Sequence, residues 1–183
     1  MKKIVISLTA TLVSITSFSQ ERVFTKNASI SFFSKTSVEN IEAHNKNAVT
    51  VLDKTTGQVE FSVLMKGFEF EKALMQEHFN ENYVESDKFP KAVFKGKISD
   101  PAKVDFTKDG EYKTTTTGNL SIHGETKEIT APVVFTVANG AIAASSEFTV
   151  ALSDYKISVP SLVKDNIAKT LKITVNSRYQ PMK

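Results

Sequence analysis

Three histidines, His44, His78 and His123, are the side chains of this chain best suited to metal binding or proton transfer. None stands at a recognised ligand spacing from a second histidine or a carboxylate, so the sequence predicts no metal site. His123 precedes Gly124 in a turn-like segment, which favours a hydrogen bond that holds a turn or a rim. His78 is a candidate for contacting the polar head of a ligand, and a purely structural contact is the alternative.

Nucleophilic catalysis has no support in the sequence. The chain contains no cysteine, and no serine stands in a Gly-x-Ser-x-Gly elbow or beside a base. Paired carboxylates such as Glu69 and Glu71 flank a turn, and nothing indicates that two of them face one another across a cleft, as glycosidase chemistry requires. Because no glycine-rich phosphate loop is present either, we expect no catalytic residue, no enzyme activity and no resident cofactor.

Apolar residues at every second position are the strongest signal in the chain. A strand that is buried on one face and wet on the other produces this alternation. Alternating runs cover residues 58–65, 92–98, 113–122, 129–137, 142–152 and 171–175. An earlier run places Phe24, Ala28, Ile30 and Phe32 on one face of the first strand. The alternation predicts about eight strands, or nine if residues 37–54 form two.

Short turn-like segments join these runs and determine how the strands are arranged. They lie at residues 53–57, 108–110, 123–125 and 139–140, as the loops of hairpins do. Strands that follow one another through short loops form an antiparallel sheet, so we predict an all-β fold. With little helix to cover its apolar face, such a sheet closes into a barrel. A sandwich predicts the same alternation and is the alternative.

Residues 71–80 break the period of two and predict a short amphipathic helix. The residues that recur at three- and four-residue spacing are Ala73, Leu74, Met75, His78 and Phe79. Because this segment lies between two predicted strands, in a barrel it must cap one mouth. Residues 153–165 have little regular pattern and are predicted to form a long loop near a rim.

The predicted inward positions combine phenylalanines with small residues. A barrel of about eight strands is just wide enough to be filled by side chains or to hold one small ligand. Small inward residues leave room for a ligand, and these are Ala28, Ala92, Gly96, Gly118, Ala131 and Ala144. From the alternation alone, a cavity and an ordinary packed core both stay open.

The first 19 residues have the composition of a secretory signal peptide. Lys2 and Lys3 precede a mostly apolar stretch at residues 4–18, and the small residues that follow predict a cut ahead of Gln20. We therefore expect a mature domain of residues 20–183 that is periplasmic or secreted and has no membrane span. Without Lys2 and Lys3 the chain carries 21 basic and 20 acidic residues, which argues against nucleic acid as a partner.

Two motifs resemble those of the YceI-like family. In the first, at residues 75–94, a helix with an aromatic residue is followed by Asp87-Lys88-Phe89-Pro90 and a strand that carries Phe94. The second is the hairpin Gly118-Asn119-Leu120-Ser121-Ile122-His123-Gly124-Glu125-Thr126-Lys127. Together with the strand spacing, the resemblance covers residues 22–179.

The resemblance implies a lipocalin-like antiparallel barrel, exported in bacteria, that takes an isoprenoid or a related long-chain amphiphile into its interior. The expected partner is thus an apolar, amphiphilic small molecule such as an isoprenoid or a fatty-acid-like lipid. The alternative is a filled barrel that acts as an envelope-stress or partner-binding module, and a homodimer is open in either case. The residues predicted to contact a ligand are Ile30, Phe32, Phe61, Val63, Met75, His78, Phe79, Phe94, Leu120, Phe135, Ala144 and Phe148.

Overall fold

The computed structural model describes residues 22–182, and the predicted signal peptide lies outside them. Most of these residues are in strands. The strands are β1 (Arg22–Lys35), β2 (Asn40–Asp53), β3 (Gln58–Leu64), β4 (Glu69–Phe70), β5 (Lys91–Ile98), β6 (Gly110–Ile122), β7 (Glu125–Ala138), β8 (Ala141–Ala151) and β9 (Thr170–Pro181). The helical segments are α1 (Ala73–His78), a π-helical turn (Phe79–Tyr83) and 3-10 turns at Met65–Gly67, Pro101–Lys103, Leu152–Tyr155 and Ser161–Val163.

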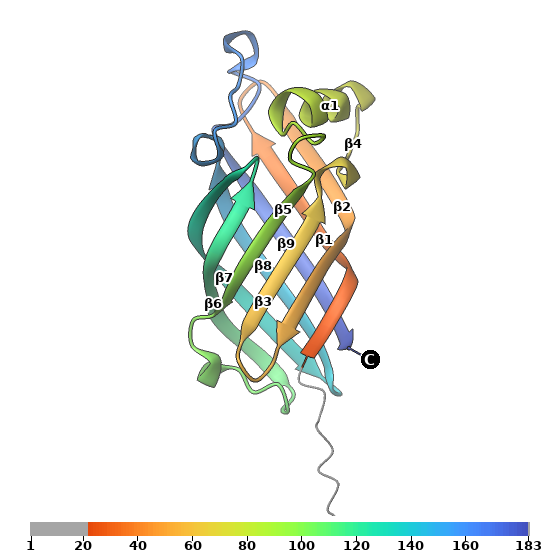
Figure 1. Cartoon of the computed structure of the whole chain (residues 1–183), viewed down its shortest axis with the longest axis vertical. Coiled ribbons are helices and arrows are strands. Elements are labelled where there is room, and N and C mark those ends of the chain that lie inside the picture. Colours follow the sequence, from red (N-terminus) through yellow and green to blue (C-terminus); the bar gives the residue numbers. More distant parts are fainter. Residues whose placement is uncertain (1–21, 183) are drawn as a thin grey trace, which may run out of the picture.

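Eight of these strands form a closed antiparallel barrel. They follow the order β1-β9-β8-β7-β6-β5-β3-β2, and β2 pairs back with β1 to complete the circle. The two-residue strand β4 only adds to the outer end of β2. The predicted barrel is therefore confirmed and the sandwich is wrong. The predicted split of residues 37–54 into two strands is also wrong, because β2 is continuous. Figure 1 shows α1 over one mouth, as predicted.

Two tight hairpins follow from glycines at the turns. His123-Gly124 joins β6 to β7, and Asn139-Gly140 joins β7 to β8. All four residues have φ between 51° and 77°, the left-handed conformation that a two-residue type I′ turn needs at both positions. The twist of this turn matches that of the flanking strands, so it fixes the register of three neighbouring strands.

A bulge near the start of β1 makes one predicted assignment wrong. The pairing of β1 with β2 shifts between Thr25 and Ala28, so the alternation changes parity there. Val23 and Thr25 are buried below the bulge, and Phe24 points to the opposite face from Ala28. A matching irregularity lies in β2, where Asn45 and Ala48 are both buried although they are three residues apart.

The helix begins and ends later than predicted. Residues 69–70 pair as β4 with β2, and Lys72 still has extended backbone angles, so α1 starts at Ala73 rather than at residue 71. The helical segment then continues beyond residue 80 as the π-helical turn. Leu74, predicted on the apolar face, is 60% exposed, whereas Met75 and Phe79 face the barrel.

Gly96 and Gly118 bring two strands together rather than widening the interior. They are paired across β5 and β6, and a Cβ on Gly118 would lie 2.3 Å from the Cα of Gly96. A side chain at either position would collide with the facing backbone, so glycine permits a close approach and a sharp bend. Neither glycine contributes to the cavity wall, so the expectation that they leave room for a ligand is wrong.

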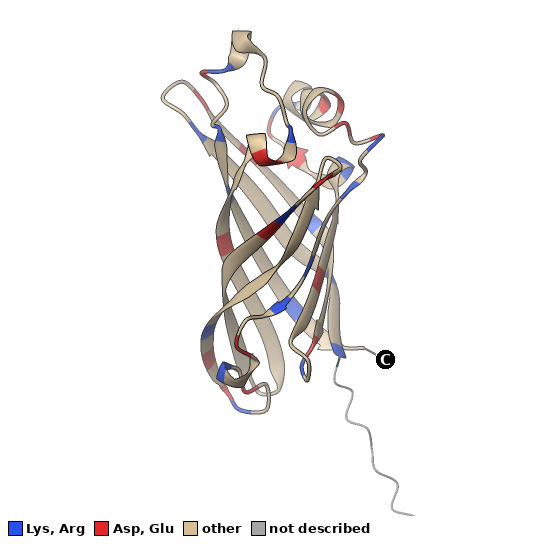
Figure 2. Cartoon of the chain, turned by 60° about the vertical axis from the view of Figure 1, so that its left-hand side comes forward, with Lys and Arg blue, Asp and Glu red and all other residues tan. Residues whose placement is uncertain are grey.

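The end of the barrel opposite α1 is filled. Residues of the loop 99–109 plug this end, and Phe106 packs edge-on against Phe135 with 5.4 Å between ring centroids. The buried cluster consists of Val23, Leu52, Ile98, Val104, Val133, Phe135, Val137 and Ile142. We call it the lower core. Basic residues (lysine and arginine) and acidic residues are interspersed over the two ends and the outer surface of the barrel (Figure 2).

Candidate ligand-binding site

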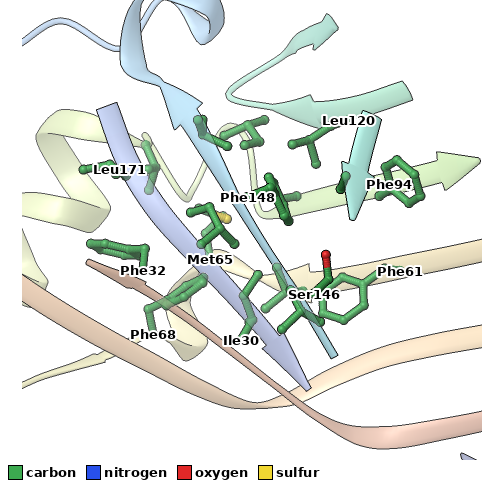
Figure 3. Close-up of a pocket in the computed structure, with 18 of the residues that line it drawn as sticks. Ile30, Phe32, Phe61, Met65, Phe68, Phe94, Leu120, Ser146, Phe148 and Leu171 are labelled. Atoms are coloured by element: carbon green, nitrogen blue, oxygen red, sulfur yellow. The ribbon is translucent and has the colours of Figure 1, made fainter. Parts of the chain in front are cut away.

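The half of the barrel beneath α1 is hollow. Its cavity has a volume of about 340 Å³, at the lower end of the ~300–1,000 Å³ of ordinary ligand pockets. Aliphatic and aromatic side chains make up most of the wall. Figure 3 shows such side chains from β1, β3, β5, β6, β8 and β9 converging on the cavity. The barrel is thus packed at one end and hollow at the other. Of the two interiors that the alternation allowed, the packed core describes the lower half and the cavity describes the upper half.

All twelve residues predicted to contact a ligand lie in the cavity wall. They are Ile30, Phe32, Phe61, Val63, Met75, His78, Phe79, Phe94, Leu120, Phe135, Ala144 and Phe148. The structure thus brings these residues together around one cavity, and their contact with a ligand stays a prediction. Of the other small residues, Ala92 and Ala131 line the cavity, whereas Ala28 is fully buried and does not.

Four phenylalanines close the cavity beneath α1. They are Phe32, Phe68, Phe70 and Phe79, and the rings of Phe32 and Phe79 each lie 5.1–5.7 Å from the other three, centroid to centroid, the spacing of attractive aromatic pairs. We call this group the aromatic roof. Sequence reasoning missed Phe68 and Phe70, although their spacing of two residues just before the predicted helix was a usable signal. The roof attaches the helical segment to β1, so α1 lies on the mouth.

His123 joins three segments at the rim. Its Nε2 lies 2.7 Å from Glu85 Oε2, and its Nδ1 lies 3.0 Å from the backbone oxygen of Tyr155. The imidazole is 13% exposed and meets the ring of Phe89 edge-on at 4.8 Å. His123 and Glu85 both have left-handed backbone angles, which cost free energy for residues with a side chain. The predicted structural role of His123 is confirmed.

Glu39 also joins three rim segments, one of which, the loop 152–169, is shared with His123. Its carboxylate accepts hydrogen bonds from Lys72 Nζ and Asn166 Nδ2, both at 3.2 Å. Glu39 belongs to the turn between β1 and β2, Lys72 precedes α1, and Asn166 lies in the loop 152–169. These bonds, that from Asn166 most of all, hold the pKa of Glu39 below its ordinary value of 4.5. The mouth is therefore framed by polar contacts between loops.

A group of hydroxyl side chains forms the floor of the cavity. Thr50 and Ser177 are 1% and 5% exposed, and Thr50 Oγ1 lies 3.3 Å from Tyr179 Oη. Ser177 lies on the same face of β9 as Tyr179 and also lines the cavity. Burial raises the pKa of Tyr179 above its ordinary value of 10.0, and the neighbouring hydroxyls of Thr50 and Ser177 counteract this only in part. Tyr179 packs on the lower core and lines the cavity, so it marks the boundary between the two halves.

Sequence reasoning missed these floor residues. Tyr179 continues the period of two of Leu171, Ile173 and Val175, so the alternation could have been extended to it. Thr50 could not be assigned in this way, because the irregularity in β2 changes the parity of the strand.

Charged groups are scarce in the cavity wall. Within residues 22–182, Glu39 and His78 are the only ionisable acids or bases of the wall apart from tyrosines, and both lie at the mouth. His78 is exposed on α1 beside the opening, and His44 is exposed on the outside, 3.4 Å from Glu42. In the same part of the chain no three histidine, cysteine or acidic side chains are placed to hold a metal ion. Apolar contact is therefore the main chemistry that the wall offers.

The family is decided by the match of most of the chain to one family model. The model of the YceI-like domain matches residues 18–178. The chain belongs to the YceI-like family. No protein of curated function matches it at the sequence level.

Three solved structures are similar to this YceI-like protein. A polyisoprenoid-binding domain from Saccharophagus degradans, implicated in plant cell wall breakdown, aligns with a TM-score of 0.76 at 10% identity, covering 90% of this chain and 100% of its own. BcnA from Burkholderia cenocepacia gives 0.69 at 17% identity, covering 84% and 96%. The YceI protein of Campylobacter jejuni gives 0.55 at 17% identity, covering 100% and 99%. At these identities the similarity establishes the fold.

Proposed function

We propose that this YceI-like protein carries or sequesters a long-chain apolar amphiphile of the isoprenoid or fatty-acid-like class. The observation that supports this best is the apolar cavity between the aromatic roof and the hydroxyl floor. Each CH₂ group that leaves water for such a wall contributes about 0.8 kcal/mol. The similar domain from Saccharophagus degradans is itself described as polyisoprenoid-binding, which agrees with this proposal.

Export belongs to the same proposal and is supported by the first 19 residues. Lys2, Lys3 and the apolar stretch that follows have the order of a cleavable signal. No helix within residues 22–182 is long and apolar enough to cross a membrane. We expect protein purified from its own host to begin at or near Gln20, in the periplasm or the medium. N-terminal sequencing that finds Met1 on the mature protein would contradict export.

The test of ligand binding uses two neighbouring alanines on β8. Ala144 lines the cavity, whereas Ala143 points away from it. We expect Ala144→Trp to occupy part of the cavity and remove lipid from protein purified from its host, with little loss of thermal stability. Ala143→Trp adds the same side chain outside and should keep the lipid.

The measurements are extractable lipid, native mass and the melting temperature of delipidated protein. In a filled barrel, Ala144→Trp would instead overpack the core at a cost of ~1–3 kcal/mol or more. The proposal fails if Ala144→Trp loses stability by this amount and the parent protein neither contains lipid nor takes up an apolar probe.

A further inference from the structure

The hydroxyl floor stands out because it is polar at the deepest point of an apolar cavity. Buried hydroxyl groups cost free energy unless they find hydrogen-bond partners. Thr50, Ser177 and Tyr179 come from β2 and β9, which are not neighbours in the barrel, yet their hydroxyls meet at one place. An ordinary apolar core needs no such group at this position.

The three hydroxyls leave hydrogen-bonding capacity facing the cavity. Together they carry three O–H donors and more acceptor lone pairs than donors. The contact of Tyr179 with Thr50 uses one of these donors. All three residues belong to the cavity wall, so the remaining capacity is open to a bound molecule.

The charge around the floor restricts what can bind there. In the wall formed by residues 22–182, no lysine or arginine is present, and Glu39 and His78 lie at the mouth. A carboxylate or phosphate at the floor would thus be buried without a counter-charge, which is strongly unfavourable. A hydroxyl or a carbonyl can exchange hydrogen bonds with neutral hydroxyls without this cost.

We propose that Thr50, Ser177 and Tyr179 form a binding subsite for an uncharged hydrogen-bonding group at the end of a long-chain ligand. The ligand enters the barrel with its hydroxyl or carbonyl end first, and its chain extends toward the aromatic roof. This subsite rests on the proposed ligand-binding function and adds the chemical class and the direction of the ligand.

The test compares three probes of equal chain length: dodecanol, dodecane and laurate. Each displaces an environment-sensitive dye from delipidated protein at neutral pH. We expect dodecanol to bind about 3- to 10-fold more tightly than dodecane, the range of one neutral hydrogen bond. Laurate should bind more weakly than dodecanol.

Tyr179→Phe should abolish the preference for dodecanol and leave the affinity for dodecane unchanged. The matched control is Tyr112→Phe, because the Tyr112 hydroxyl donates to the backbone oxygen of Lys108 outside the cavity. Ser177→Ala provides a second variant should Tyr179→Phe fail to fold, and it should reduce the preference in the same direction.

Three results would overturn the subsite while leaving ligand binding intact. The first is dodecane binding without any preference for dodecanol. The second is a preference for dodecanol that stays unchanged in the folded floor variants. The third is laurate binding as tightly as dodecanol. If none of the three probes displaces the dye from folded protein, the proposed function itself fails.

Discussion

Single residues at the rim combine backbone strain with polar contacts. His123 and Glu85 have left-handed backbone angles, and a hydrogen bond of 2.7 Å joins His123 Nε2 to Glu85 Oε2. Lys156, which follows Tyr155 in the chain, has φ of 53° and an ion pair with Glu125 at 2.7 Å. Such strain persists where surrounding contacts determine the conformation. The geometry of the rim therefore depends on a few side chains, with His123 at their centre.

Replacing His123 tests this dependence. His123→Ala removes the contacts with Glu85 and with the Tyr155 carbonyl, so we expect the free energy of unfolding to fall by about 1–3 kcal/mol. The measurement is urea denaturation of delipidated protein. His44→Ala is the control, because the His44 side chain is exposed and its ion-pair partner Glu42 is exposed as well. Equal stability of the two variants would contradict the structural role of His123.

At the scale of elements, the mouth is bordered by loops and by the helical segment, which polar contacts join to one another. The turn between β1 and β2, the start of α1 and the loop 152–169 meet at the Glu39 carboxylate. The aromatic roof adds the contact between the helical segment and β1. Loops at a rim open locally at lower cost than core strands, so we expect these polar contacts to control access to the cavity.

The pH dependence of the rim follows from Glu39. Its pKa is lowered in the folded protein, so the carboxylate contributes stability above the ordinary value of 4.5. That contribution is lost as the pH falls through the folded value. We expect ligand release to accelerate with acidification over this range in the parent protein and to depend less on pH in Glu39→Gln. The rate of dye release at several pH values measures this, and identical profiles would refute it.

At the scale of the whole molecule, the barrel divides stability and binding between its two ends. The lower core is packed and closed by the loop 99–109, and Leu52 within it has no exposed surface. The other half keeps its apolar side chains around empty space. A filled half supplies packing free energy, whereas a hollow half leaves apolar surface available to a ligand.

This division predicts unequal effects of core truncations. Leu52→Ala should lower the free energy of unfolding by about 2–5 kcal/mol because it leaves a cavity in packed surroundings. Phe148→Ala removes more atoms but should cost less than the ~3–5 kcal/mol typical of this change, since Phe148 already faces the cavity. Urea denaturation of delipidated protein compares them. A larger loss for Phe148→Ala would show that the upper half is also a packed core.

The class of fold and much of the cavity wall follow from local patterns in the amino-acid sequence. The period of two assigns side chains to one face of a strand, and the glycine turns fix which strands are neighbours. That is why Phe94, Leu120 and Phe135 were assigned correctly, together with the position of the helix. The assignment failed at Phe24, because a bulge changes parity without an unambiguous signal in the sequence.

Local patterns do not show which half of the barrel is hollow or where its polar groups meet, because both depend on how distant strands and loops pack in the folded barrel. Periodicity reports the face on which a residue lies and gives no information about the volume enclosed. That volume depends on the closure of the barrel, on the loop that plugs one end and on strand contacts such as that between Gly96 and Gly118. Thr50 and Tyr179 lie 129 residues apart in the chain. Barrel closure brings them together, because it fixes the positions of strands that local patterns leave independent.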